Sequence, residues 1–451
     1  MVQCELSPGC LNRGLKQLVN LKPYLVKKVA PSSAQVRELE CDAGGKEAAT
    51  GASQRALPHA VIIVENMTVP PDRRVWQQAL ALKNSGWRVS MITPKLGSHR
   101  KSFEVIEGVN IYRHDLWIEA RRILHYPIEY TSALIGEIRL LYKIGLGDID
   151  VVQICNPPDF LFLPALLAKT FGRAKVVFDH HDLTPELLTE KTGKTRGWLM
   201  SLAKWAERQT FKTANRVIST NPSFKDRAIE LGKKKSDAVC VVYSSPNLER
   251  LVEGDVNPEL KQGKKNLLFW IGMMGNQDGV DVLLETMVHL RTMPGGDDFH
   301  LLIAGEGPER PSLERYARKL GVDDCVTFAG FMSGKDLADA FATADIGVGS
   351  DPKNEFNDRL AMNKVMEYMA HRMPAALFDL TECRRIAGDS AFYATNNDPQ
   401  RLAAQISNLL VSPKMRQTMG DRAYHRLKAE FSWEQQRQEY LNVYTSLINT
   451  D

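Results

Sequence analysis

The amino-acid sequence predicts an α/β protein made of two Rossmann-like, doubly wound domains. The chain has 451 residues, which exceeds the size of one ordinary hydrophobic core. From Ala60 onward, short segments rich in valine and isoleucine alternate with helical segments, and a second series of the same kind follows a polar linker. Strands that alternate with helices are typical of parallel sheets covered by helices on both faces.

The first series contains the predicted strands of the N-terminal domain. They lie at residues 60–66, 88–93, 109–114, 151–155, 175–182, 216–220 and 240–243. Several are apolar on both faces, as expected for parallel strands that helices cover on both sides. The segment DRRVWQQALALKNSG, residues 72–86, is the first predicted crossover helix.

The second series begins after the polar stretch GDVNPELKQGKKN, residues 254–266. Its predicted strands lie at residues 267–272, 300–305, 326–330, 345–350, 374–379 and 391–395. A last helix begins at Ser432 with Gln435 three residues later, which is a capping box. Its apolar residues recur on one side of the helix, so we expect this helix to pack on a part that is already folded.

These patterns divide the chain into four parts. Residues 1–57 end in a stretch rich in glycine and alanine and are predicted to be a flexible extension. Residues 58–250 form the first α/β domain and residues 251–430 the second, and residues 431–451 form the last helix. The extension also holds the basic segment LNRGLKQLVNLKPYLVKKVAP, in which apolar residues fall near helical spacing. That segment is read either as a disordered tail or as a helix that lies on a membrane surface.

Composition excludes several classes of protein. The formal net charge is only +4, so the chain lacks the basic excess of a nucleic-acid-binding protein. The seven cysteines are scattered without a CxxC pair, which indicates a reducing compartment and no structural metal. No apolar run is long enough to span a membrane, and the first residues lack the apolar core of a signal peptide. We therefore expect a cytoplasmic protein.

Ligands of open α/β sheets bind beyond the carboxyl ends of the strands, so the residues that follow each strand are candidates for a site. After the strand at 267–272, Gly275, Asn276 and Gln277 form a glycine-bearing turn into a helix, suited either to an anion or to an ordinary turn. After the strand at 300–305, Gly305 and Gly307 precede another helix. Taken alone, this second motif is more typical of a structural turn than of a ligand site.

The stretch NDRLAMNKVMEYMAHRMPAALFD, residues 357–379, combines an apolar helix with an unusual number of polar groups at its start. We expect the helix to begin near Ala361, with Asn363 and Lys364 in its first turn. A cation there opposes the helix dipole unless an anion such as a diphosphate binds at that end. Glu367 follows one turn after Asn363, where its carboxylate is able to bind the two hydroxyls of a ribose or to pair with Lys364.

Polar residues also follow two strands of the first series. The run DHHD places Asp179, His180, His181 and Asp182 at the end of the strand at 175–182, and we expect a functional role for at least one histidine. Asp182 is alternatively the cap of the next helix. After the first strand, Asn66, Arg73 and Arg74 flank a Pro-Pro turn. One of the two arginines is expected to face the cleft.

Taken together, these motifs carry a family resemblance. The chain from about Ala60 to Tyr444 resembles the GT-B glycosyltransferases of family 4. The matching segments are PPDRRVWQQALALKNSGWRVSMITP, NPPDFLF, FDHHDLTPE, GNQDGVD, IAGEGPE and NDRLAMNKVMEYMA. Their order and their spread over most of the chain make the match specific.

The resemblance implies two Rossmann-like domains that face each other across a cleft, with a nucleotide sugar bound mainly by the C-terminal domain. It also implies transfer with retention and without a required metal. Glu367 matches the ribose-binding glutamate of the family, whereas Arg359 stands where the family has its first glutamate. The role of the missing carboxylate then passes to Asp358 or Glu355, or is lost.

The same resemblance indicates which residues supply positive charge near the diphosphate. The loop after the first C-terminal strand has Asn276 and Gln277 where the family has cations, so Lys364 and Arg359 are expected to supply the positive charge. His180 or His181 is expected to stabilise the charge that develops on the departing diphosphate and on the sugar, by hydrogen bonding.

The sequence therefore predicts a retaining glycosyltransferase that needs no cofactor. It takes a sugar from a UDP- or GDP-sugar and adds it to a cell-surface glycan or a lipid-linked acceptor. A nucleotide-sugar epimerase and a non-catalytic nucleotide-sugar binding protein are the alternatives. The segment GWLMSLAKWAERQTFK, residues 197–212, mixes tryptophans with cations and suggests peripheral contact with the inner membrane face, although it equally fits a helix that packs on its own domain.

Overall fold

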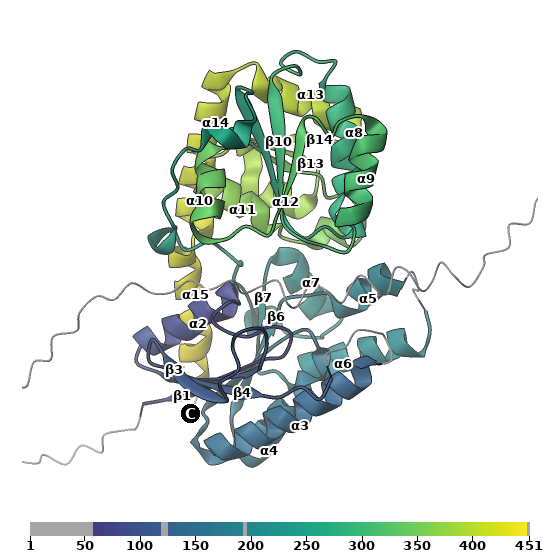
Figure 1. The fold of residues 1–451 in the computed structure, drawn as a ribbon. Helices are drawn as coiled ribbons and strands as arrows, with labels where there is room; N and C mark the ends of the chain where they lie inside the picture. The colour runs from purple at the N-terminus through teal and green to yellow at the C-terminus, as the bar shows by residue number, and fades with distance from the viewer. Residues whose placement is uncertain (1–56, 119–124, 193–195, 449–451) are drawn as a thin grey trace, which may run out of the picture.

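The computed structural model describes residues 57–118, 125–192 and 196–448. The predicted flexible extension lies almost entirely outside these residues. The described chain forms two α/β domains, each built around one sheet, and this confirms the predicted fold class (Figure 1).

The N-terminal domain contains an eight-stranded sheet in the order β3-β4-β2-β1-β5-β6-β7-β8. Every pair of neighbours is parallel except β3 and β4. The bounds are β1 His59–Val64, β2 Arg88–Pro94, β3 Phe103–Ile106, β4 Val109–His114, β5 Val151–Cys155, β6 Lys175–His180, β7 Arg216–Ser219 and β8 Val239–Val241. All predicted strands of this series are present, and β3 is an addition that the sequence patterns did not predict.

The C-terminal domain contains a six-stranded parallel sheet in the order β11-β10-β9-β12-β13-β14. The bounds are β9 Asn266–Ile271, β10 Phe299–Ala304, β11 Val326–Gly330, β12 Ile346–Gly349, β13 Ala375–Phe378 and β14 Ala391–Ala394. In each sheet the chain first adds strands on one side of its first strand and later continues on the other side. The change lies between β1 and β5 in the first sheet and between β9 and β12 in the second. Ligands of doubly wound sheets bind at such switch points.

Helices cover both faces of each sheet. In the N-terminal domain they are α2 Arg73–Asn84, α3 Tyr126–Ile144, α4 Phe162–Phe171, α5 Thr184–Thr192, α6 Trp198–Thr213 and α7 Pro222–Glu230. In the C-terminal domain they are α8 Val280–Leu290, α9 Arg310–Leu320, α10 Gly334–Thr343, α11 Asn363–Ala370, α12 Thr381–Ala387, α13 Pro399–Leu410 and α14 Pro413–Arg426. Among the described residues, no helix combines the length and the apolar character needed to cross a bilayer.

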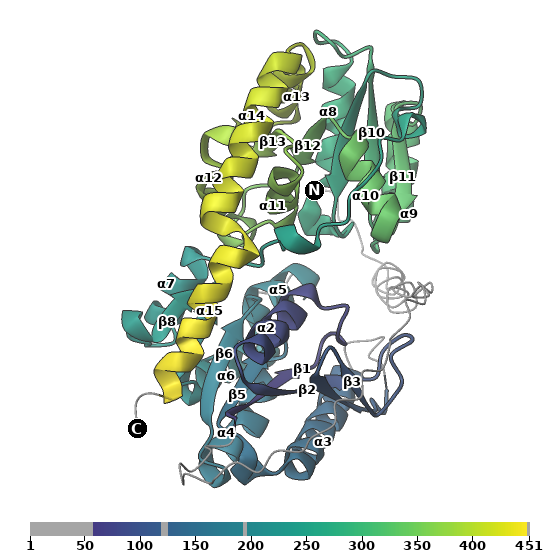
Figure 2. The same cartoon turned by 90° about the vertical axis from the view of Figure 1, so that its left-hand side faces the viewer.

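The last helix, α15 Trp433–Ile448, joins the two domains. A short π-helical turn, Leu427–Phe431, connects it to α14, and the pair runs from the C-terminal domain along the N-terminal one (Figure 2). Tyr440 and Tyr444 are fully buried in the core between α2 and the first sheet. The last helix is therefore a structural part of the N-terminal domain.

The two domains also touch directly beside the cleft. Asn221, at the start of α7, donates from Nδ2 to the backbone oxygen of Arg359 at 2.9 Å. Leu183 and Phe224 of the N-terminal domain pack with Phe356 of the C-terminal domain. These contacts hold the strand ends of the two sheets opposite each other.

Candidate functional site

A cavity of about 420 Å³ lies between the two domains. Its N-terminal wall is the Pro-Pro turn and the start of α2, and its C-terminal wall is the first turns of α11. The segment between β8 and the second domain, residues 244–251, closes one side. Four predicted site residues line this cavity, namely Arg73, Arg74, Asn363 and Glu367.

Arg73 and Glu367 bridge the domains across this cavity. Arg73 Nη2 lies 2.5 Å from Glu367 Oε1. The guanidinium side chain is 76% exposed, whereas the carboxylate side chain is only 13% exposed. Glu367 therefore presents a largely buried acceptor to the cavity, and its present partner is a solvated, easily displaced cation.

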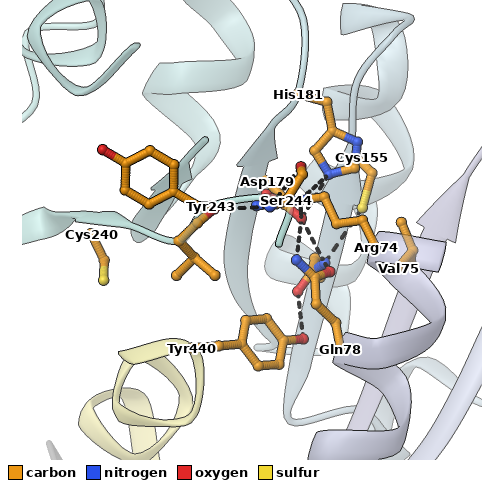
Figure 3. Close-up of polar contacts among 12 residues, drawn as sticks. Arg74, Val75, Gln78, Cys155, Asp179, His181, Cys240, Tyr243, Ser244 and Tyr440 are labelled. Atoms are coloured by element: carbon orange, nitrogen blue, oxygen red, sulfur yellow. Dashed lines mark hydrogen bonds and ion pairs between the residues drawn. The ribbon is translucent and has the colours of Figure 1, made fainter. Parts of the chain in front are cut away.

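Arg74 differs from its neighbour because its side chain is buried. It donates from Nη2 to Asp179 Oδ1 at 2.7 Å and from Nε to Asp179 Oδ2 at 3.2 Å (Figure 3). It also donates from Nη1 to the backbone oxygen of Val242 and to Ser244 Oγ. The expectation that an arginine of this pair faces the cleft holds for Arg73, and Arg74 instead anchors the start of α2 to β6.

Asp179 is fully buried at the end of β6 and connects Arg74 to His181. His181 Nε2 lies 2.7 Å from Asp179 Oδ2 and 3.0 Å from Arg74 Nε. Nε2 cannot both donate to Asp179 and accept from Arg74. The shorter contact, with the charged carboxylate, favours a protonated Nε2, and Nδ1 is then the ring nitrogen that turns away from Asp179. Burial disfavours the charged carboxylate, but the charges of Arg74 and His181 lower the pKa of Asp179 well below its usual range.

This network continues to the last helix. Gln78 donates to Asp179 Oδ2 at 2.6 Å, and Gln153 donates to Gln78 Oε1 at 2.7 Å. The oxygen of Gln153 in turn accepts from the hydroxyls of Tyr440 and Tyr444 at 2.9 and 2.6 Å. A continuous buried chain of hydrogen bonds thus links α15 to the histidine at the cleft (Figure 3).

Cys155, Asp179 and His181 have ligand atoms close enough together to hold a metal ion. The guanidinium of Arg74 contacts both Asp179 and His181, so a cation already occupies this position. Burial, with the nearby Asp179 charge, raises the pKa of the Cys155 thiol well above its usual value. The residues in this arrangement do not fit a metal ion.

Asn156 holds the backbone that carries His181. Its Oδ1 accepts from the backbone nitrogen of His181 at 2.7 Å, and its Nδ2 donates to the backbone oxygen of Asp182 at 2.7 Å. Asn156 is buried directly after β5, the strand beside the switch point. The predicted residue Asp182 is half-buried at the entry of α5.

His180 does not reach the cleft. Its ring is fully buried and lies within 5.2 Å, centroid to centroid, of Phe178, Phe211 and Phe224. Burial lowers the pKa of His180 to about 3, so the ring is neutral at physiological pH. The prediction of His180 as a catalytic residue is therefore corrected to a core position, and His181 remains.

Lys364 lies at the start of α11, as predicted, but its charge has an internal partner. Its Nζ lies 2.9 Å from both carboxylate oxygens of Asp351 and 4.6 Å from the ring centroid of Trp270. Both charged side chains are at least nine-tenths buried. A diphosphate at this end would meet a neutral pair, which corrects the expectation of a free ammonium.

The glycine-bearing turn after β9 forms a short 3-10 helix, Asn276–Asp278. Gly275 donates its backbone N–H to Asp278 Oδ2 at 3.0 Å, and the backbone oxygen of Gln277 accepts from Asn357 Nδ2 at 2.8 Å. Burial raises the pKa of Asp278 to about 6. The positive charge of Lys364 opposes this rise, and the negative charge of Asp351 adds to it. The exposed side chain in this turn is that of Asn276.

Gly305 and Gly307 have a packing reason to be glycine. A Cβ on Gly305 would lie 1.8 Å from the backbone oxygen of Gly272, and one on Gly307 would lie 2.2 Å from that of Met274. Gly305 also has a positive φ of 137°. The two glycines let this turn pack against the loop after β9, which brings two strand-end loops together.

The residues around the missing first glutamate lie in a separate 3-10 turn, Asn357–Arg359, because α11 begins at Asn363 and not near Ala361. Asp358 accepts from the backbone nitrogen of Thr381 at 2.7 Å and from its hydroxyl at 2.9 Å, and so caps α12. Arg359 pairs with the exposed Glu355 at 3.3 Å. Asp358 is therefore not a substitute for the missing carboxylate.

Family models match both domains. Residues 71–244 match the glycosyl transferase 4-like domain, and residues 265–412 match the group 1 glycosyl transferases. The chain belongs to the family 4 glycosyltransferases of the GT-B fold.

Three curated relatives of this glycosyltransferase are similar along much of their length. An uncharacterized glycosyltransferase of Methanocaldococcus jannaschii is 23% identical over 81% of this chain and 91% of its own. The alpha-D-kanosaminyltransferase of Streptomyces kanamyceticus is 22% identical over 87% of this chain and 96% of its own. A lipopolysaccharide core biosynthesis glycosyltransferase of Rhizobium meliloti is 22% identical over 52% of this chain and 66% of its own.

Solved structures show the same fold. Sucrose-phosphate synthase from Thermosynechococcus elongatus superposes with a TM-score of 0.68 at 17% identity, covering 88% of this chain and 100% of that structure. The Anabaena protein HepE, solved with UDP and glucose, superposes with a TM-score of 0.63 at 12% identity, covering 86% of this chain and 100% of that structure.

Sequence reasoning missed several residues that build the site of this glycosyltransferase. Asp351 and Asn156 each lie one or two residues past a strand, so the rule that singled out the DHHD run applies to them as well. No comparable indication in the sequence marks three further residues, Gln78, Gln153 and Tyr440. A polar group inside an apolar segment indicates a hydrogen-bond network only when its partner is known. Asn66 lies exposed after β1, outside the residues that line the cavity.

Proposed function

We propose that this glycosyltransferase moves a sugar, with retention and without a metal, from a UDP- or GDP-sugar to a cell-surface glycan or lipid-linked acceptor. The observation that carries the proposal is the cavity between the domains, where Glu367 and Asn363 of α11 face Arg73. A donor bound from α11 would then lie open to an acceptor on the N-terminal side.

In this proposal the ribose of the donor replaces Arg73 as the partner of Glu367. Two adjacent hydroxyls match the two oxygens of a carboxylate, and Glu367 is buried enough for these hydrogen bonds to be strong. The diphosphate lies against the amides at the start of α11 and the turn at Gly275 and Asn276. The solved HepE complex with UDP and glucose supports a nucleotide sugar as the class of donor.

Positive charge for the diphosphate comes from exposed side chains of both domains. Arg73 and Arg359 are 76% and 39% exposed, so both are free to turn toward an anion. His181 contacts Arg74, which lines the cavity. As an imidazolium, the ring would keep its Nε2–H on Asp179 and donate its Nδ1–H to the departing diphosphate or to the transferred sugar.

The acceptor is a saccharide or a lipid-linked saccharide of the cell surface. One relative is named for lipopolysaccharide core biosynthesis, which favours this class. Asn66 and Arg73 are the residues of the N-terminal domain that we assign to the acceptor side.

A thermal-shift screen of UDP- and GDP-sugars tests the donor, since a ligand that binds the native state raises its Tm. We expect one nucleotide sugar to raise the Tm and the matching free sugar to leave it unchanged. Incubation with the donor alone, followed by analysis of the sugar, identifies an epimerase. A stabilising donor without turnover on any saccharide or lipid-linked acceptor would overturn the proposed activity.

Replacing Glu367 with alanine is expected to raise the KM for the donor by about ten- to a hundredfold, because hydrogen bonds to a charged group are lost. Folding should change little, since within the described part of the chain the ion pair removed is the one with the exposed Arg73. Glu430→Ala is the matched control, because its side chain is 51% exposed, pairs with Arg426 and lies outside the cavity. An unchanged donor KM in Glu367→Ala would refute the ribose assignment.

Donor affinity is expected to fall as the pH rises through about 6, the pKa of Asp278. Below this pH the carboxyl is neutral, and above it a negative charge appears beside the turn that we assign to the diphosphate. The loss should be about threefold or more between pH 5 and 7.5, as expected for one nearby like charge. Titrations of Asp278→Asn should show no such step, and those of Asp281→Asn, on the exposed side of α8, should retain it.

A further inference from the structure

Helices α3, α4 and α6 form one layer on the N-terminal sheet, opposite the layer that contains α2 and α15 (Figures 1 and 2). Their inner sides pack in a core that includes Leu141, Ala165 and Phe211. Their outer sides face solvent, and we call this surface the outer helical face.

The outer helical face is apolar in a way that is unusual for a solvated surface. On α3, Ile128, Ile135 and Tyr142 are spaced seven residues apart and are all exposed. On α4, Phe171 is 72% exposed.

The face continues on α6, where both tryptophans of the helix are exposed. Trp198 is 71% and Trp205 is 48% exposed, and Leu202 between them is also exposed. The rings of Trp205 and Phe162 of α4 form a T-shaped pair with centroids 5.6 Å apart, so α6 and α4 adjoin in one surface. Large aromatic side chains placed this way are typical of contacts at a membrane interface.

Charge on the outer helical face has one sign. The three helices contain three acidic residues, Glu129, Glu137 and Glu207, and all three are buried. The exposed charged residues of the same helices are cations, namely Arg139, Lys143, Lys204, Arg208 and Lys212. An apolar surface that carries cations and no exposed acid complements an anionic bilayer.

We propose that the outer helical face docks on an anionic phospholipid surface. A second copy of the chain would bring two cationic faces together, which repels. The basic segment at residues 11–31 contains five cations and no acid in its sequence, so it repels the same face. An anionic lipid surface fits both the charge and the apolar character of the face, because its headgroups bind cations and its interface accommodates aromatic rings.

The fluorescence of the exposed tryptophans reports on the outer helical face. The chain has seven tryptophans. Trp117, Trp198 and Trp205 are exposed, and Trp117 adjoins α3 through a hydrogen bond from its backbone nitrogen to Ser132. The other four, Trp76, Trp87, Trp270 and Trp433, are buried. Acrylamide therefore quenches mainly the fluorescence of this face.

The test uses the full chain, without substrate, and vesicles of phosphatidylcholine with or without phosphatidylglycerol. We expect the protein to float with the anionic vesicles at low salt, to be released at high salt, and to lose acrylamide quenching when bound. Lys204→Glu with Arg208→Glu should lower the partition coefficient about tenfold or more. Lys414→Glu with Lys428→Glu, on exposed positions of the C-terminal domain, is the matched control and should bind like the wild type.

Three results would overturn the proposal. Failure of the wild type to float with anionic vesicles is the first, and equal loss of binding in the control pair is the second. The third is bound protein whose exposed tryptophans remain fully quenched, which would mean that another part of the chain makes the contact. Because no substrate is present, none of these outcomes depends on the transferase activity.

Discussion

Replacing Arg74 with methionine is expected to lower the free energy of unfolding by about 3 to 5 kcal/mol, the usual loss when one partner of a buried ion pair is removed. Asp179 is fully buried, and Arg74 contacts both of its oxygens. Without the guanidinium, the carboxylate keeps Gln78, His181 and a long contact with Gln153 as partners. Urea unfolding followed by circular dichroism measures the loss.

The adjacent arginine provides the matched control. Arg73→Met removes a side chain of the same size one residue earlier, but that side chain is 76% exposed. Exposed ion pairs contribute about 1 kcal/mol or less, so this variant should unfold near the wild-type midpoint. Equal effects of the two substitutions would contradict the assignment of Arg74 to a buried pair.

The pH dependence of the Arg74 variant should reverse in sign. In the wild type the lowered pKa of Asp179 adds stability above the unfolded value of about 3.9, and this stability is lost as the pH falls. Without Arg74, we expect burial to outweigh the remaining contacts with His181 and Gln78 and to raise the pKa of Asp179, so stability falls as the pH rises. Asp179→Asn combined with Arg74→Met removes the buried charge and should recover part of the loss at pH 8.

The fold could be predicted from the sequence because buried parallel strands leave a strong pattern. Runs such as residues 60–64 and 301–303 are apolar on both faces and bounded by polar turns. The strand β3, Phe103–Ile106, escaped this reasoning because it lies at the edge of the sheet, where its side chains alternate between exposed and half-buried. An edge strand needs no apolar run, so the sequence gives little sign of it.

The choice between neighbouring residues could not be made from the sequence. Side chains along a strand alternate between the two faces of a sheet, so Asp179 points to the layer of α2 and α15, and His180 points to the layer of α6 and α7. Which of the two histidines, His180 or His181, lies on the ligand's side therefore depends on a register of one residue. The same limit applies to Arg73 and Arg74 at the start of α2, and to Lys364, whose partner Asp351 comes from another loop.

Replacing His181 with alanine is expected to lower kcat by about a hundred- to a thousandfold, the usual cost of losing one positioned donor to a transition-state charge. The donor KM should change much less, because we assign the ribose contact and most of the diphosphate contacts to other residues, mainly of the C-terminal domain. Steady-state kinetics with saturating acceptor separate the two constants. Stability should also change little, since Asp179 keeps Arg74 and Gln78 as partners.

His180→Phe is the matched control for this prediction. His180 lies among Phe178, Phe211 and Phe224, so a fourth phenyl ring fills the same space without a buried polar group. This variant should fold and keep kcat within a few-fold of the wild type. A loss of activity in His180→Phe together with normal turnover in His181→Ala would reverse the assignment and place the reacting sugar on the other side of β6. The two histidines are adjacent in sequence, so only their opposite orientations in the fold predict different outcomes.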